Sequence, residues 1–321
     1  MSSRRDFLKT ALALTSAGAA AGAAKANAAP ASAPTAAKDK DAPSAHVGCL
    51  VDTTLCVGCR KCEEACNKRN KLAQPKKPFS DREVLRDARR PSINAFTVIN
   101  AHHGAPSQVQ QDHDETFVKL QCMHCLDPAC VSACIVGALT KNASGSVDYD
   151  AQRCIGCRYC MVACPFEIPS YEYDDPLTPR VRKCTYCADG SEHGPDPACA
   201  AACPMEAIVF GPRSDLLALA RKRVAQQPDR YHPEVYGAKE VGGTSWLYLV
   251  GRTPKEIGLL PLPETAPPRL TEAIQHGIFR YGAAPVAVYG SLAAIMWFTN
   301  RKNKNASDAD PHAEEEGGSH E

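Results

Sequence analysis

Four cysteines stand close together in residues 154–165, which read CIGCRYCMVACP. Cys154, Cys157, Cys160 and Cys164 follow one another at steps of three, three and four residues, and Pro165 comes next. Thiolates are soft ligands that select zinc, copper(I) or iron–sulfur clusters. Zinc sites typically use separated cysteine pairs, whereas three cysteines at i, i+3 and i+6 suit three corners of one cubane cluster.

The spacing C-x2-C-x2-C-x3-C before a proline is that of bacterial ferredoxins, in which the fourth cysteine binds the other cluster of a pair. The opening motif therefore requires a partner, and the chain has three more groups of four. These are Cys56, Cys59, Cys62 and Cys66; Cys122, Cys125, Cys130 and Cys134; and Cys184, Cys187, Cys199 and Cys203. Asn67 and Ile135 replace the proline in the first two groups, whereas Pro204 follows the last. Sixteen cysteines in this pattern predict four 4Fe–4S clusters with thiolate-bound iron.

Two other uses of so many cysteines stay open at this stage. Disulfides are common in exported cysteine-rich chains, and four zinc sites would make this a zinc-bound structural protein. Both are disfavoured, because cysteines two residues apart rarely form structural disulfides and triple-cysteine runs are unusual at zinc. Cys49 is expected to be a buried thiol, and His124 a neighbour of the ligands or a solvated side chain.

The net charge and the motifs that the sequence lacks argue against two further classes of function, nucleic-acid binding and catalysis. The net charge is +1 over 321 residues, so a nucleic-acid partner is not expected, and 25 prolines with 21 glycines indicate many turns. The sequence shows no nucleophile–base set, no phosphate-binding glycine loop and no substrate motif. We therefore expect an electron carrier that is not itself an enzyme.

The N-terminal residues have the order of an export signal. Arg4 and Arg5 precede Phe-Leu-Lys, an apolar run follows, and Ala-Asn-Ala before residue 29 offers a cleavage site. This order predicts a twin-arginine signal peptide at 1–28, followed by a linker at 29–46. The alternative is a surface helix with a chance arginine pair.

An uncharged run, Tyr281–Thr299, lies near the C-terminus. Its length is close to the roughly 30 Å hydrocarbon core of a bilayer, which predicts a transmembrane helix at 279–300. Arg301, Lys302 and Lys304 follow it, so the positive-inside rule places the tail at 301–321 in the cytoplasm. The body would then lie on the periplasmic side of the inner membrane. The alternative is a buried core helix.

The residues between these ends are expected to form an α+β fold. The cluster-bearing body is predicted at 47–212 and a covering extension at 213–275. Within them we expect strands at 47–52 and 246–250 and from Ala207, and a hairpin over 138–150. A short helix should follow the three residues that separate the third and fourth cysteines of each motif. Ser214 should cap an amphipathic helix.

Several stretches resemble one family of electron carriers. They are QCMHCLDPACVSAC, RCIGCRYCMVACPFEIPSYEYDDP, YHPEVYGAKEVGGT and QHGIFRYGAAP. The chain resembles the four-cluster ferredoxin-like subunits of membrane-bound oxidoreductases, above all the electron-transfer subunit of hydrogenase-2-type nickel–iron hydrogenases. The same superfamily contains the iron–sulfur subunits of formate dehydrogenases and dimethyl sulfoxide reductases.

The resemblance implies a nested ligand arrangement with four sets. Set 1 is Cys56, Cys59, Cys62 and Cys203. Set 2 is Cys66, Cys184, Cys187 and Cys199. Set 3 is Cys122, Cys125, Cys130 and Cys164. Set 4 is Cys134, Cys154, Cys157 and Cys160. The first and last motifs would then form one two-cluster module, and the middle motifs a second module inserted into it.

The resemblance also implies a relay and its partners. Electrons would pass from the hydrogenase large and small subunits, through the clusters, to an integral membrane quinone-reactive subunit. The alternative is an iron–sulfur subunit of a formate dehydrogenase or another molybdenum oxidoreductase. In those complexes the catalytic subunit usually carries the export signal, so a signal on this chain favours the hydrogenase.

Overall fold

The computed structural model describes residues 46–103, 115–188 and 196–307. The predicted signal peptide, the linker up to residue 45 and the tail from residue 308 lie outside the described residues. The described chain is a mixed α and β structure, in agreement with the expected fold class. Its strands form one three-stranded sheet and three two-stranded pairs.

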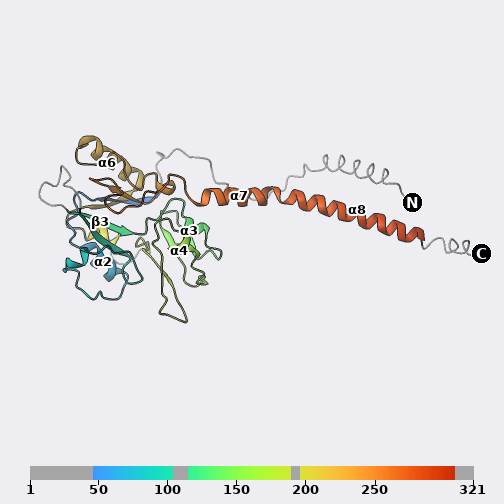
Figure 1. Cartoon of the computed structure of the whole chain (residues 1–321), viewed down its shortest axis with the longest axis horizontal. Helices are drawn as coiled ribbons and strands as arrows, with labels where there is room; N and C mark the ends of the chain where they lie inside the picture. The colour runs from blue at the N-terminus through green and yellow to red at the C-terminus, as the bar shows by residue number, and fades with distance from the viewer. Residues whose placement is uncertain (1–45, 104–114, 189–195, 308–321) are drawn as a thin grey trace, which may run out of the picture. The chain divides into compact units, whose positions relative to one another are not determined.

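The central sheet has the order β8 (Ile208–Pro212), β1 (Val47–Asp52) and β9 (Trp246–Leu249). Strand β1 is antiparallel to β8 and parallel to β9. Because successive side chains of a strand point to opposite faces, Leu50 and Leu247 pack with α6 (Arg213–Gln226) on one face. Cys49 and Trp246 point to the other face of the sheet. There they belong to a separate hydrophobic cluster that contains many of the cysteines. Figure 1 shows α6 beside this sheet.

Helices that contain the cysteines pack in two pairs. Helix α2 (Lys61–Arg69) packs against α5 (Ala198–Ala201), which joins the first motif to the last. Helix α3 (Ala129–Ser132) packs against α4 (Tyr159–Ala163), which joins the two middle motifs. Motifs that are distant in the chain are therefore neighbours in space, as nested modules require.

Three two-stranded pairs and two 3-10 turns complete the body. Strands β2 (Thr97–His103) and β3 (Glu115–Gln121) are antiparallel, and β2 contacts α2. The other pairs are β4 (Leu139–Lys141) with β5 (Val147–Tyr149), and β6 (Ser170–Tyr171) with β7 (Val181–Arg182). The turns are η1 (Glu83–Leu85) and η2 (Glu240–Gly242).

The structure confirms some expected elements and corrects others. The hairpin over 138–150 and the strands at 47–52, from Ala207 and at 246–250 are present. The short helices do not follow the three residues between the third and fourth cysteines. Instead, α3, α4 and α5 end before the fourth cysteine of their motifs. Pro212, not Ser214, is the N-cap of α6, and the Ser214 hydroxyl donates to Asp215 instead. The extension at 213–275 also contributes β9 to the central sheet, so it does more than cover the body.

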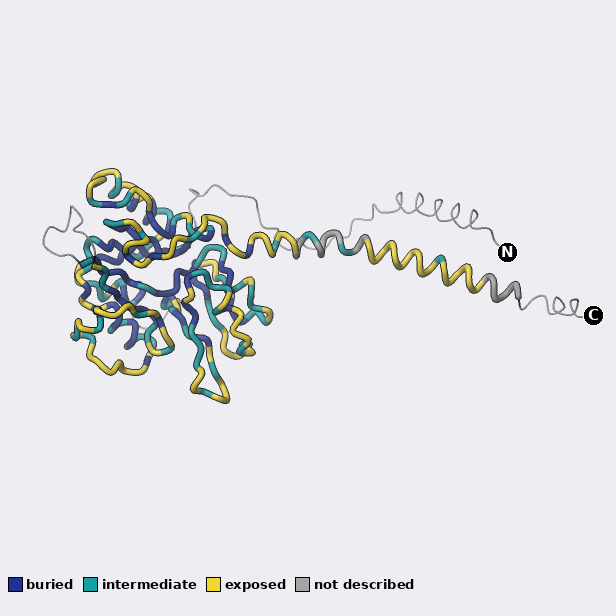
Figure 2. Tube along the Cα trace, in the orientation of Figure 1, coloured by how far each residue is buried: buried dark blue, intermediate teal, exposed yellow. Residues whose placement is uncertain are grey.

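The C-terminal residues form two helices, α7 (Pro268–Tyr281) and α8 (Ala283–Ser307). Gly282 separates them, and α8 contains the uncharged run from the third residue of that run onward. Among the described residues, no helix combines the length and the apolar character that a membrane crossing requires, and the span at 279–300 stays a prediction from the sequence. Figure 2 shows most of the described part of α8 as exposed.

A buried ion network fixes α2 against the strands. The Glu63 carboxylate, next to the ligand candidate Cys62, accepts hydrogen bonds from Arg60 at 2.9 Å and Arg89 at 2.6 Å. It also accepts the backbone N–H of Ile99 in β2 at 2.6 Å. Burial strengthens such bonds but makes an unpaired charge costly. Glu63 therefore determines where α2 lies relative to β2.

We expect Glu63→Gln to lower the free energy of unfolding by about 3–5 kcal/mol, because it leaves two arginines near a neutral partner in a buried site. The measurement is unfolding followed by circular dichroism under anaerobic conditions. Glu64→Gln is the matched control, since Glu64 is half-exposed and pairs with exposed Lys61, and exposed pairs contribute little. Equal stability of the two variants would show that the network does not hold α2.

Candidate metal centres

Each motif begins with a tight loop that has the same backbone geometry. The third residue of the first C-x-x-C has a positive φ in all four motifs: Gly58 at 65°, His124 at 46°, Gly156 at 71° and Tyr186 at 60°. This conformation costs an L-residue about 1–2 kcal/mol and suits glycine. Two motifs nevertheless place a large side chain there, so contacts of these two side chains must offset the cost.

A second shared turn follows the fourth cysteine in three of the motifs. Gly137, Glu167 and Glu206 have positive φ, and each donates its N–H to the carbonyl of the cysteine three residues earlier. Ile135 replaces proline without altering this turn. The first motif differs, because α2 continues through Asn67 to Arg69. The missing proline therefore changes the backbone at Asn67 only.

The loops bring the cysteines of the first and last motifs together. Cys56, Cys59, Cys62 and Cys203 line one small cavity, and these are the members of set 1. Burial raises the pKa of Cys66 well above its ordinary value, and three further thiols raise it more. Those thiols are Cys184, Cys199 and Cys187, which with Cys66 make up set 2.

The middle motifs form the other two groups. Burial raises the pKa of Cys125, and the neighbouring thiols of Cys122, Cys164 and Cys130 raise it further; together they are set 3. Burial likewise raises the pKa of Cys160 to about 11, with further contributions from Cys154, Cys157 and Cys134, the rest of set 4. The structure thus gathers the cysteines into the four predicted sets, while their binding of iron stays a prediction.

The sets also have a spatial order. Cys199 of set 2 acts on the pKa of Cys62 in set 1. Cys122 of set 3 acts on that of Cys184 in set 2. Cys160 of set 4 acts on that of Cys130 in set 3. Neighbouring thiols therefore link set 1 to set 2, set 2 to set 3 and set 3 to set 4, and the packed core clusters likewise join sets 1 to 3 and sets 3 and 4.

The donor groups fit iron–sulfur clusters. Several sulfurs accept hydrogen bonds: Ala138 N–H donates to Cys134 at 3.2 Å and Tyr186 N–H to Cys184 at 3.4 Å. Such bonds to sulfur tune cluster potentials. All seventeen cysteines are free of disulfides, and Cys49 is buried in β1 as expected. Within the described ranges, no three His, Cys, Asp or Glu side chains converge on a single metal ion.

His124 is not solvated, contrary to one of its two expected roles. It is fully buried, and its Nδ1 accepts the N–H of Val147 at 2.9 Å. Its ring centroid lies 4.7 Å from that of Tyr186. Burial, with nearby Lys183, lowers the pKa of His124 well below its usual value, so the ring is neutral. This ring pair joins a loop of set 3 to a loop of set 2. Its only sign in the sequence is that two motifs have a large residue at the position where the other two have glycine.

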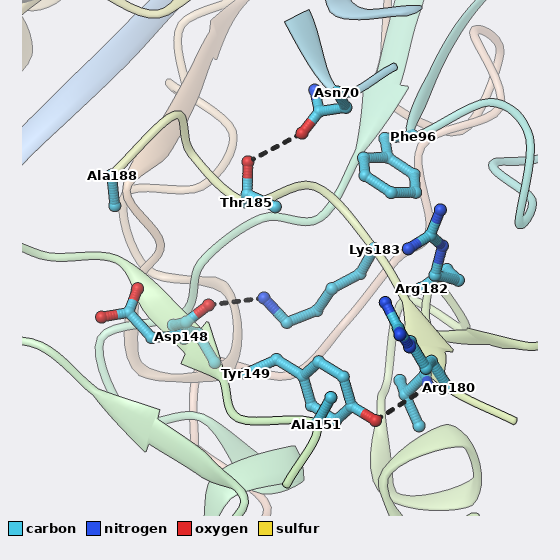
Figure 3. A pocket seen from close by; sticks show the side chains of 12 residues that line it. Asn70, Phe96, Asp148, Tyr149, Ala151, Arg180, Arg182, Lys183, Thr185 and Ala188 are labelled. Atoms are coloured by element: carbon cyan, nitrogen blue, oxygen red, sulfur yellow. Dashed lines mark hydrogen bonds between the residues drawn. The ribbon is translucent and has the colours of Figure 1, made fainter. Parts of the chain in front are cut away.

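A separate pocket of about 520 Å³ contains no cysteine. Figure 3 shows Arg180, Arg182 and Lys183 among its lining side chains. Lys183 donates to the carbonyl of Val147, and Thr185 donates to Asn70 at 3.2 Å. Residues near set 2 and residues of β5 and β7 thus meet at this pocket, which lies outside the four sets.

Comparison with known proteins identifies the family. A family model described as a 4Fe–4S dicluster domain matches residues 113–213. The chain is 44% identical over 268 residues to a protein of Nitratidesulfovibrio vulgaris, covering 83% of this chain and 70% of that one. It is 33% identical over 306 residues to the hydrogenase-2 operon protein HybA of Escherichia coli O157:H7, with 86% and 92% covered. For the formate dehydrogenase-O iron–sulfur subunit of Escherichia coli K12 the identity is 34% over 253 residues, with 77% and 79% covered.

The chain belongs to this family of iron–sulfur subunits. It is an iron–sulfur electron-transfer subunit that carries multiple 4Fe–4S clusters, as the cysteine pattern predicted. Such clusters take up and release single electrons at potentials set by their surroundings. Apart from the exposed Cys59 and Cys157, the cysteines are buried or half-buried, and backbone N–H groups donate hydrogen bonds to the sulfurs of Cys134 and Cys184.

We expect Gly58→Ala to lose the iron of set 1, roughly four atoms per chain. A Cβ at Gly58 would lie 2.5 Å from the Phe117 ring, and the positive φ adds strain. Gly137→Ala is the matched control, because Gly137 has a similar φ of 62° with no atom within 4 Å of the new Cβ. Iron and sulfide analysis of anaerobically purified protein measures the effect. Full iron content in both variants would show that close packing at Gly58 does not shape the site.

Proposed function

We propose that the chain relays electrons between a nickel–iron hydrogenase catalytic pair and a quinone-reactive membrane subunit. The observation that carries this proposal is the row of four cysteine sets. In it, sets 1 to 4 each ligate one 4Fe–4S cluster through the sixteen named cysteines. The hydrogenase large and small subunits perform the catalysis, and this chain is non-catalytic. The similarity to HybA, which covers 92% of that relative, supports the hydrogenase branch.

The exposure of the cysteines supports a relay with two ends. Cys59 in set 1 and Cys157 in set 4 are exposed, whereas every cysteine of sets 2 and 3 is buried or half-buried. The terminal sets are thus the ones nearest to solvent. Exposed apolar side chains flank Cys157, among them Ile155 and Tyr159. Electrons therefore enter and leave at sets 1 and 4, where partner subunits can approach.

The second candidate is the iron–sulfur subunit of a formate dehydrogenase or another molybdenum oxidoreductase. The 34% identity to the formate dehydrogenase-O subunit favours it. The arginine pair at the N-terminus of this chain favours the hydrogenase, because in the molybdenum complexes the catalytic subunit usually carries the export signal. Purification in mild detergent and identification of the large subunit decides between the two.

Cys160→Ser tests the relay, because a hydroxyl is a poor substitute for a thiolate at an iron corner. We expect hydrogen-dependent dye reduction by the catalytic pair to persist while quinone reduction falls at least tenfold. Cys49→Ser is the matched control, since Cys49 lies outside the four sets, and it should retain both activities. Loss of both activities by Cys160→Ser in an assembled complex would contradict a relay role.

We further propose that the chain is exported and lies on the periplasmic side of the inner membrane. The twin-arginine pattern supports export of an already folded, cluster-loaded chain. Exposed apolar side chains of α8, including Val286, Met296 and Phe298, support attachment to the membrane or to its apolar subunit.

Arg4→Lys together with Arg5→Lys should retain the chain in the cytoplasm, because the export receptor reads the arginine pair. Fractionation of cells into cytoplasm, periplasm and membranes measures the result. Protease treatment of spheroplasts should degrade the wild-type chain and spare the double variant. Normal export of the variant would refute the signal assignment.

A further inference from the structure

Lys119 is a fully buried cation in the core beside sets 1 and 2. It lies on β3, and only 2% of its surface is exposed. Its Nζ donates to the Gln121 amide oxygen at 2.8 Å and lies 4.2 Å from the centre of the Trp246 ring. Among the described residues, no carboxylate forms an ion pair with it.

Gln121 and Tyr248 form hydrogen bonds that stabilise the Lys119 ammonium group. The Gln121 side-chain N–H donates to the Tyr248 hydroxyl at 2.6 Å, and that hydroxyl donates to the Lys119 carbonyl at 2.7 Å. This closed arrangement turns the Gln121 amide oxygen toward the ammonium group. One neutral hydrogen bond and one aromatic ring offset only part of the cost of burying an ammonium. A further source of negative charge must therefore lie nearby.

The cysteines supply that negative charge. Lys119 lines the same cavity as the four cysteines of set 1. The Trp246 ring beside its ammonium group packs in the same core cluster as Cys184 and Cys199 of set 2, and these two thiols also act electrostatically on Lys119. Arg60 lines this cavity too, but the Glu63 carboxylate compensates its charge at 2.9 Å. Lys119 is thus the uncompensated cation shared by two sets.

We propose that Lys119 is a fixed positive charge that raises the reduction potentials of the clusters in sets 1 and 2. The proposal rests on the ligand sets of the proposed function. A cluster gains one negative charge on reduction, and a nearby cation in a low-dielectric site favours the more negative state. Water screens this interaction little, because the ammonium is buried. Lys119 thereby makes the clusters of sets 1 and 2 easier to reduce.

The test is a redox titration of the full-length chain monitored by electron paramagnetic resonance. Lys119→Met removes the charge and keeps an unbranched side chain against Trp246, and Lys119→Gln removes it while keeping a polar end. In both variants we expect two of the four clusters to become harder to reduce. The reduction equilibrium of these two should change at least tenfold, which is 59 mV for a one-electron couple. The other two potentials and the iron content should match the wild type.

Lys61→Met is the matched control, because Lys61 adjoins Cys62 but its side chain is 59% exposed and pairs with Glu64. Solvent screens its charge, so its removal should leave all four potentials in place. Iron-loaded Lys119 variants with unchanged potentials would overturn the proposal. Loss of iron from both Lys119 variants, with a loaded wild type, would overturn it as well, because Lys119 would then be a structural residue. A wild-type chain that shows fewer than four clusters would instead refute the ligand sets themselves.

Discussion

Each set of four thiols takes three from one motif and one from another, and this sharing is the constraint on which the rest of the structure depends. No motif can complete a set alone, so α2 must pack against α5 and α3 against α4. The partners of the first pair lie at opposite ends of the body sequence. Strand β1 just before the first motif and β8 just after the last are therefore neighbours in one sheet, which closes the body around the sets.

Two buried charged side chains in the body, Glu63 and Lys119, have different roles. Glu63 is paired with Arg60 and Arg89, so it orients α2 without leaving an unpaired carboxylate near Cys62. Lys119 has no carboxylate partner among the described residues, and its charge acts on the thiolates instead. Both groups are buried, where electrostatic interactions are weakly screened. The Glu63 network thus positions α2, whereas Lys119 places a positive charge beside the thiolates.

The junction between the two modules has its own physical requirement. Sets 2 and 3 meet where the rings of His124 and Tyr186 contact each other at a tilt of 47°, and both residues have a positive φ that glycine would adopt at less cost. Trp246 packs edge-on against Tyr186 with ring centres 6.0 Å apart. Aromatic contacts of this kind contribute about 0.5–1.5 kcal/mol beyond burial, which is of the size needed to offset the backbone cost. The packing of these three rings keeps the loop of set 3 that contains His124 beside the loop of set 2 that contains Tyr186.

The sequence alone determined the ligand chemistry, since cysteine spacing is a local property that three thiolates on one loop must satisfy. Strands with clear boundaries, such as β1 and the β4–β5 hairpin, were predictable for the same reason. Only the tertiary structure decided the parallel pairing of β1 with β9, the antiparallel pair of β2 and β3, the burial of Lys119 and the order of the four sets. The segment ETFVKLQ gives no sign that its lysine is inside. These features arise from contacts between segments far apart in the chain, and no local pattern records which distant groups will share a core.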